Sequence, residues 1–140
     1  MTMVPVIYWS GTGNTKAMAQ AVAEGIQEAG GEARLLSVEE ISAGEAAKSP
    51  KLALGCPAMG AEVLEESEFE PFFAQLEGAL SGKEVALFGS YGWGDGQWMR
   101  DWSERTQAAG ATLCAEPVIC NETPDAAGLE QCRQLGRKLV

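Results

Sequence analysis

The sequence predicts a single α/β domain of three layers, with helices on both faces of a parallel sheet. Two observations predict it. Short runs rich in Val, Ile and Leu alternate with longer segments of helical periodicity, and no repeat, linker or low-complexity tract interrupts them. The chain has 140 residues, of which 46% are hydrophobic and 21% charged, so it is long enough for one core and too short for two. We expect residues 1–140 to form one doubly wound domain.

The predicted strands and helices follow one another along the chain. Each predicted strand is a short apolar run, and the five runs are Val4–Tyr8, Ala33–Val38, Lys51–Gly55, Glu84–Gly89 and Thr112–Cys120. The predicted helices have apolar residues three or four positions apart. The first is marked by Met18, Val22, Ile26 and Ala29, and the others are Pro71–Leu80, Gln97–Ala109 and Ala126–Leu139. Since each strand reaches the next through a crossover helix, the strands are expected to be parallel.

Charge and composition exclude several classes of function. The chain has 20 acidic and 10 basic residues, a formal net charge of −10, and no histidine. This acidity disfavours binding to nucleic acid or to an anionic membrane, and no apolar run is long enough to span a bilayer. The lack of histidine excludes Ser-His-Asp and Cys-His catalysis and histidine-ligated zinc. We therefore expect a bound group to supply the chemistry, without catalytic side chains or a metal site.

The cysteines and the N-terminal segment bear on the compartment. No Cys-x-x-Cys pair is present, and the cysteines are expected to be small core residues in a reducing environment; they are Cys56, Cys114, Cys120 and Cys132. The residues from Met1 to Pro5 do not combine a basic and an apolar segment, so no secretory signal is expected. We expect a cytoplasmic protein.

A loop after the first strand suits a phosphate group. Ligands of doubly wound sheets bind beyond the carboxyl ends of the strands, and there Gly11 and Gly13 let backbone N–H groups converge at a helix N-terminus. Four side chains of the loop can donate hydrogen bonds: Ser10, Thr12, Asn14 and Thr15. The Walker A motif is absent, and Lys16 stands where the pattern GxGxxG requires glycine. A helix cap without a ligand is the alternative, although a cap needs only one such side chain.

Two further loops follow the third and fourth strands. They run from Cys56 to Glu62 and from Gly89 to Gly96. The glycines of the third loop let the backbone approach a planar ligand closely, and Trp93 stands among them, where a large aromatic ring can stack on that ligand. A Trp93 folded back onto the core is the alternative. Trp98 and Trp102 have helical spacing and are expected to be packing residues.

Together the three loops resemble those of the flavodoxins, small electron carriers that bind FMN, and in particular the short-chain flavodoxins of clostridia and related anaerobes. The resemblance covers nearly the whole chain and is strongest at Tyr8–Thr15, Gly55–Gly60, Leu64–Phe72 and Leu87–Asp101. It implies the strand order 2-1-3-4-5 and a monomeric low-potential one-electron carrier, not an enzyme, that passes through quinone, semiquinone and hydroquinone states. The implied FMN-binding residues are Ser10, Gly11, Thr12, Gly13, Asn14, Thr15, Pro57, Ala58, Met59, Gly60, Ala61, Glu62, Ser90, Tyr91, Gly92, Trp93, Gly94 and Asn121.

The resemblance also implies separate roles around the flavin. Met59 and Trp93 would lie against its two faces, and the Glu62 carboxylate would accept a hydrogen bond from flavin N3–H. Ser90 and Asn121 are weaker candidates, for the phosphate end and for the ribityl chain.

The Gly60–Ala61 peptide is the expected point of redox control. Glycine adopts backbone angles closed to other residues, so this peptide can flip, and in the resembled family the flipped carbonyl accepts a hydrogen bond from N5–H of the semiquinone. Ala61 stands where a polar residue is common in the resembled sequences, so any side-chain contribution to the flip is lost.

Acidic residues gather beside the predicted flavin site. No basic residue lies between Leu52 and Gly82, and the acidic residues there are Glu62, Glu65, Glu66, Glu68, Glu70 and Glu77. Asp95 and Asp101 would lie near the opposite rim. Negative charge opposes an anionic reduced flavin, and it would steer redox partners with basic docking surfaces, such as reductases and low-potential oxidoreductases. A solvated acidic face without such a role is the alternative.

Two other functions would use the same fold and cofactor. A flavodoxin-like NAD(P)H-dependent FMN reductase or quinone reductase needs a second pocket, commonly basic, where Trp93 would lie here. A flavodoxin-like activator of ribonucleotide reductase would differ only in its partner. A response-regulator phosphoacceptor would share only the topology. It needs acidic residues at the end of the first strand, and the sequence offers none there, since it has Tyr8, Trp9 and Ser10.

Overall fold

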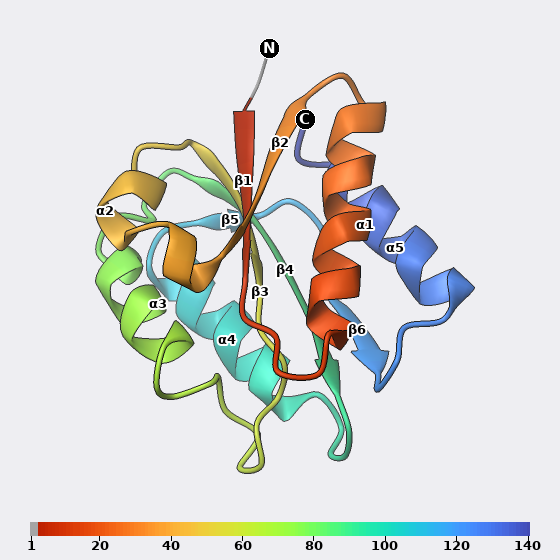
Figure 1. Cartoon of the computed structure of the whole chain (residues 1–140). Coiled ribbons are helices and arrows are strands. Elements are labelled where there is room, and N and C mark those ends of the chain that lie inside the picture. The colour runs from red at the N-terminus through yellow and green to blue at the C-terminus, as the bar shows by residue number, and fades with distance from the viewer. Residues whose placement is uncertain (1–2) are drawn as a thin grey trace.

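A parallel sheet forms the central layer of the computed structural model, which describes residues 3–140 (Figure 1). Its strand order is β2-β1-β3-β4-β5, with β6 also paired to β4, so the predicted order is confirmed. The strands are β1 (Met3–Tyr8), β2 (Glu32–Ser37), β3 (Lys51–Gly55), β4 (Glu84–Tyr91), β5 (Thr112–Leu113) and β6 (Val118–Asn121). Met1 and Thr2, part of the segment in which no secretory signal is expected, lie outside the described residues.

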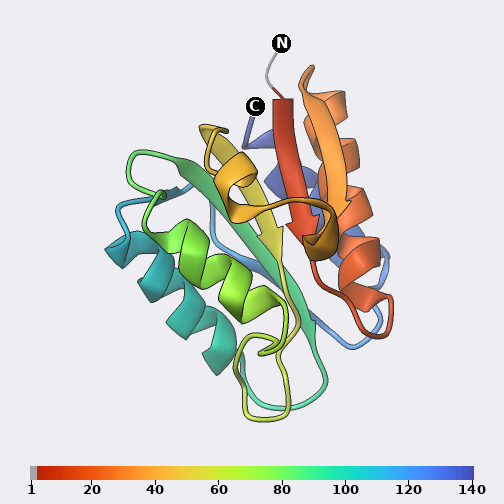
Figure 2. The same cartoon turned by 60° about the vertical axis from the view of Figure 1, so that its left-hand side comes forward.

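Helices cover both faces of the sheet, as Figures 1 and 2 show. On one face lie α1 (Asn14–Glu28) and α5 (Ala126–Arg137), and on the other lie α2 (Ala43–Ala46), α3 (Phe69–Glu77) and α4 (Gln97–Ala108). Neighbouring residues of β1 pack into different cores, Val6 with α1 and α5 and Ile7 with α3 and α4, because strand side chains alternate between faces. None of the helices in residues 3–140 is long and apolar enough to cross a membrane.

The edge of the sheet differs from the prediction. The single strand expected over Thr112–Cys120 is wrong, because β5 and β6 are separate strands that both pair with β4. From the pair Glu84–Thr112 to the pair Phe88–Val118 there are four residues along β4 but six along the segment that contains β5 and β6. Pro117 lies in the intervening segment, and proline has no N–H for a sheet hydrogen bond, so pairing resumes only after it.

Two short elements were not predicted. They are α2 and the 3-10 turn η1 (Val38–Glu40), which connect β2 to β3. Each spans about one turn, too few residues to show a helical period in the sequence. The signal that was present is Ser42, whose side chain accepts a hydrogen bond from the N–H of Glu45 and caps α2.

The cysteines are core residues, as predicted. Cys56, Cys120 and Cys132 are buried, Cys114 is half-buried, and all four are free thiols. Burial raises the pKa of the Cys114 thiol to about 11, so this group stays protonated and unreactive at neutral pH.

The buried carboxylate of Glu65 fixes the loop between β3 and α3. It accepts hydrogen bonds from the backbone N–H groups of Ser67 (2.9 Å), Glu68 (2.8 Å) and Phe69 (2.9 Å), and from the Ser67 hydroxyl. Burial raises the pKa of this carboxyl, but the hydrogen bonds stabilise its charged form more, so its pKa lies below the ordinary value. Glu65 therefore caps the first turn of α3.

We expect Glu65→Gln to lower the free energy of unfolding by about 1–2 kcal/mol at neutral pH, as the loss of a helix cap does. Because the pKa of Glu65 is lower in the folded than in the unfolded chain, its contribution is complete above the unfolded-state pKa and is lost as pH falls through the folded-state pKa. Urea unfolding should therefore show the difference from wild type shrinking in acid.

The matched control for this prediction is Glu66→Gln, which changes the exposed neighbouring carboxylate. Equal losses in the two variants, or a difference that grows in acid, would show that Glu65 does not cap α3.

Candidate functional site

The three predicted loops meet beyond the carboxyl ends of β1, β3 and β4, at the lower end of the sheet in Figure 1. The strand order reverses there, since the chain passes from β1 to one neighbour, β2, and then back to the other, β3. A cavity of about 480 Å³ lies between the loops. The residues that line it are Trp9, Gly11, Thr12, Asn14, Pro57, Ala58, Met59, Ser90, Tyr91, Gly92, Glu122 and Thr123.

The first loop presents unused hydrogen-bond donors to this cavity. Gly13 has a φ of 94° as the N-cap of α1, and within residues 3–140 no side chain caps this helix. The Ser10 hydroxyl instead accepts a hydrogen bond from the N–H of Gly13 at 3.0 Å, which orders the loop. The first turn of α1 contains no acidic residue. This helix end therefore favours an anion through its free N–H groups and its dipole.

A buried hydrogen bond joins the first loop to β4. The hydroxyl oxygens of Thr15 and Ser90 lie 3.0 Å apart, and both residues are almost fully buried. Only one proton is used in this contact, so the hydroxyl that accepts keeps its own proton for a further acceptor. The pair thus fixes the spacing of two loops and leaves one donor beside the cavity.

The second loop closes in a tight turn at Glu62. The N–H of Glu62 donates to the carbonyl of Met59 at 2.8 Å, and Met59 donates in turn to the carbonyl of Val63 at 3.0 Å. Glu62 has a φ of 52°, which is unusual for a residue other than glycine, whereas Gly60 and Ala61 do not have positive φ. The strain in this turn therefore lies at Glu62.

The Glu62 carboxylate packs against the third loop without a hydrogen-bond partner. Its Oε1 atom is buried and unpaired within residues 3–140. Gly94 has a φ of 88°, and a Cβ atom there would lie 2.1 Å from this oxygen. A buried carboxylate oxygen without a donor is costly, so a group that donates a hydrogen bond to Glu62 would stabilise this arrangement.

The tryptophans divide into two kinds. Trp93 is 64% exposed, so the alternative that it folds back onto the core is wrong. Trp98 and Trp102 are buried packing residues, as predicted. The Trp98 indole N–H donates to the carbonyl of Cys56 at 3.2 Å, and its ring contacts that of Tyr91 at 5.7 Å between centroids. Trp93 is thus left free to cover a ligand.

The structure brings half of the predicted residues to the wall of the cavity. Nine of them line it: Gly11, Thr12, Asn14, Pro57, Ala58, Met59, Ser90, Tyr91 and Gly92. The other residues predicted in the three loops lie beside it without lining it: Ser10, Gly13, Thr15, Gly60, Ala61, Glu62, Trp93 and Gly94. Asn121 also does not line the cavity; its side-chain amide donates to the carbonyl of Tyr91 at 3.4 Å.

Three cavity residues were missed by the sequence prediction. Trp9 directly precedes the phosphate loop, and its indole N–H donates to Glu68 at 3.1 Å. Glu122 and Thr123 follow β6, and the N–H of Glu122 donates to the carbonyl of Tyr91 at 2.7 Å. Applying the rule that ligands bind at the carboxyl ends of strands to the last strand would have found Glu122 and Thr123.

The predicted acidic stretch is largely neutralised or otherwise bonded, which corrects its interpretation as an unopposed negative field. Arg105 of α4 pairs with both oxygens of Glu70, at 2.7 and 2.6 Å, and with both of Glu77, at 2.8 and 2.9 Å. These charge-assisted bonds raise the pKa of the Arg105 guanidinium above its ordinary value. Glu65 caps α3, and near the opposite rim Asp95 pairs with Arg100 at 2.9 Å.

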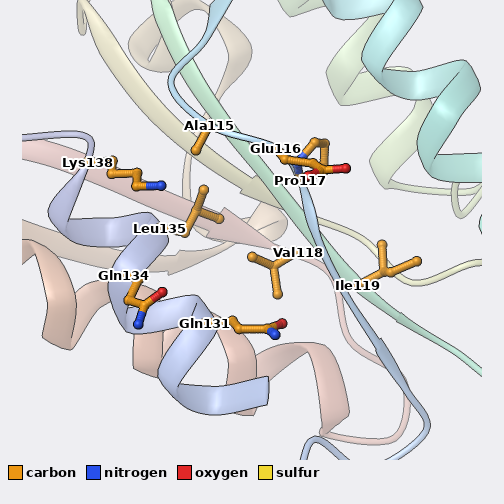
Figure 3. Close-up of a pocket in the computed structure, with 9 residues that line it drawn as sticks. All are labelled: Ala115, Glu116, Pro117, Val118, Ile119, Gln131, Gln134, Leu135 and Lys138. Carbon is orange, nitrogen blue, oxygen red and sulfur yellow. The ribbon is translucent and has the colours of Figure 1, made fainter. Parts of the chain in front are cut away.

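A second hollow of about 300 Å³ lies between α5 and the chain that connects β5 to β6 (Figure 3). No predicted site residue lines it. Its charged side chains, Glu116 and Lys138, lie on opposite sides of it in Figure 3 and do not converge on one point. This hollow therefore lacks the converging polar groups that the cavity at the strand ends has.

Known proteins resemble this chain over nearly its full length. The family model described as Flavodoxin matches residues 6–136. The flavodoxin of Clostridium beijerinckii is 48% identical over 135 residues, covering 96% of this chain and 97% of that protein. The flavodoxin of Megasphaera elsdenii is 46% identical over 134 residues, covering 96% of each. The solution structure of two-electron reduced Megasphaera elsdenii flavodoxin matches with a TM-score of 0.90 and covers 98% of each chain.

We expect Arg105→Met to lower the free energy of unfolding by about 1–3 kcal/mol, because it leaves two half-buried carboxylates unpaired. The Arg105 side chain is 29% exposed, whereas that of Arg100, in its pair with Asp95, is 52% exposed. Arg100→Met is therefore the control, and its effect should stay within about 0.5 kcal/mol. Urea unfolding measures both, and equal effects would show that the Arg105 network does not stabilise the fold.

Proposed function

The chain belongs to the flavodoxin family, and we propose that the loops after β1, β3 and β4 hold the FMN of this electron carrier. Flavodoxins bind FMN and transfer electrons, so the protein is an electron-transfer protein and not an enzyme. FMN, when bound, supplies the redox chemistry, since a flavin can accept and release electrons one at a time. The observation that carries the assignment of the site is the buried, unpaired carboxylate oxygen of Glu62 beside the third loop.

The first loop would hold the FMN phosphate. The free N–H groups at the start of α1 and the spare hydroxyl proton of the Thr15–Ser90 pair support this role. The proposed phosphate-binding residues are Ser10, Gly11, Thr12, Gly13, Asn14 and Thr15, with Ser90. Asn121, at the end of β6, is proposed for the ribityl chain.

The second and third loops would hold the flavin ring between them. Glu62 would accept a hydrogen bond from the flavin N3–H, which satisfies its buried oxygen. Met59 and the exposed ring of Trp93 would cover the two faces. The backbone that meets the ring would come from Pro57, Ala58, Gly60, Ala61, Tyr91, Gly92 and Gly94.

The charges around the site support a low-potential carrier with a basic partner. Glu122 lines the cavity, Glu62 belongs to the second loop and Glu66 follows that loop. None of these three carboxylates has an ion-pair partner within residues 3–140. Negative charge here would oppose the second electron and attract a reductase or oxidoreductase with a basic docking surface. We also propose that the protein is cytoplasmic and monomeric, in keeping with its free cysteines and its net charge of −10.

Titration of the flavin-free chain with FMN tests the proposed site. The wild type should bind FMN and be reduced in two separate one-electron steps during anaerobic titration. Gly94→Ala should raise the Kd about tenfold or more, because a Cβ at this positive φ would collide with the Glu62 carboxylate. A wild-type chain that does not bind FMN would overturn the proposed function.

The control for this titration is Gly82→Ala, which changes another glycine of positive φ (81°). A Cβ atom at Gly82 meets nothing within 4 Å, and this residue lies in the turn before β4, at the opposite end of the sheet from the site. It should therefore cost stability through backbone strain and leave the Kd for FMN within about twofold. Equal increases in Kd for both variants would contradict a specific role of Gly94.

Ionic strength tests the charge of the docking surface. We expect the rate of electron transfer from the FMN-loaded protein to a basic reductase to fall as salt rises from about 20 to 300 mM, because salt screens exposed charges. Stopped-flow measurements with Glu122→Gln should give a weaker salt dependence. Glu32→Gln, at the amino end of β2 and far from the site, is the control. A rate independent of salt would contradict electrostatic steering.

A further inference from the structure

Two buried polar side-chain atoms in residues 3–140 have no hydrogen-bond partner: Oε1 of Glu62 and Nε1 of Trp102. Both residues line the same cavity of about 120 Å³, which lies between the second loop and α4. A carboxylate oxygen can only accept a hydrogen bond and an indole N–H can only donate one. The two unpaired atoms therefore have complementary requirements on the walls of one small space.

The other hydrogen-bond donors around this cavity already have partners, and Asp101, another carboxylate on its wall, accepts from Gln97 at 2.8 Å. The guanidinium of Arg105 is committed to Glu70 and Glu77. The second indole on α4, that of Trp98, donates to the Cys56 carbonyl at 3.2 Å. Within the described part of the chain, the Trp102 N–H is thus the indole donor of this cavity that remains unused.

Packing fixes the position of the Trp102 ring. Its side chain is 2% exposed, and it meets the rings of Phe69 and Phe73 edge to face, with centroids 5.5 and 5.8 Å apart. Such contacts hold an aromatic ring in one orientation. The donor is therefore held in place by α3 and α4, whereas the Glu62 side chain lies on a loop and can adjust to it.

We propose that Trp102 is a positioning residue for Glu62, which its indole N–H reaches through water held in the cavity that both residues line. A space of this size has room for water, and a water molecule there would donate to the carboxylate and accept from the indole. Each carboxylate oxygen can accept two hydrogen bonds, so Glu62 can accept from this water and from the flavin N3–H together. The effect of Trp102 on FMN binding and on the reduction potential rests on the proposed function. Trp102, which makes no contact with the FMN cavity, would hold the carboxylate in the orientation that the flavin N3–H requires.

The flavin-free chain provides the first test, which does not depend on FMN. The protein has 4 tryptophans, so its indole N–H signals in a ¹⁵N–¹H spectrum can be assigned by single substitutions. Glu62→Gln should shift the Trp102 signal and change its hydrogen-exchange rate. Glu66→Gln, at an exposed carboxylate that does not line the cavity, is the control and should leave both unchanged. A Trp102 signal that is the same in wild type and Glu62→Gln would overturn the proposal.

A double-mutant cycle with FMN provides the second test. Trp102→Phe removes the N–H and keeps an aromatic ring, and it should raise the Kd for FMN about 3- to 10-fold and shift the reduction potential. In the Glu62→Gln background the same substitution should change the Kd less than about twofold. Equal effects in both backgrounds would assign Trp102 a packing role only and would overturn the proposal, while FMN binding by the wild type would leave the proposed function standing.

Replacement of Trp102 by benzothienylalanine keeps the size of the ring and removes only the N–H, so it separates hydrogen bonding from packing if the phenylalanine variant is unstable. We expect it to raise the Kd as Trp102→Phe does. A wild-type Kd in this variant would overturn the proposal.

Discussion

The close contact between the ends of β3 and β4 is the constraint on which the rest of the site depends. A Cβ atom at Gly89 would lie 2.2 Å from the carbonyl oxygen of Cys56, so the two backbones touch at this point. The same carbonyl accepts the Trp98 indole N–H, and the N–H of Ala58 continues the pairing by donating to Ser90 at 3.0 Å. The second and third loops therefore leave the sheet from one rigid junction, which brings their tips together over the cavity.

The parts of this site that could be predicted from the sequence are those encoded by neighbouring residues. The glycines and hydroxyls of Ser10–Thr15 and the glycines around Trp93 carry their conformational requirements in a few consecutive positions. The split edge strand could not be placed from apolar character alone, because its pairing depends on β4, although Pro117 was a local signal that the strand breaks. Glu122 and Thr123 were missed because they belong to no motif and reach the cavity only through the fold.

The acidic stretch shows why charge can be counted from a sequence but not placed. Glu70 and Glu77 look unopposed because no basic residue is near them in the chain, yet Arg105 reaches both from α4. The negative field at the site is consequently smaller than the six glutamates suggest and comes from fewer residues. Any depression of the flavin potential must then depend on the few carboxylates that remain near the cavity, of which Glu122 lines it.

Glu62, at the end of its turn, combines two energetically unfavourable features. Glu62 has a positive φ of 52°, and one of its carboxylate oxygens is buried without a partner. A local strain of this kind persists only where the surroundings enforce it, here the hydrogen bond to Met59 and the contact with Gly94. A flip of the Gly60–Ala61 peptide to a type II turn would require positive φ at Ala61, whose Cβ makes that conformation cost roughly 1 kcal/mol more than glycine would. Alanine at this position therefore favours the present turn, in which Glu62 faces the third loop, and it would make a flip of the Gly60–Ala61 peptide harder than a glycine would.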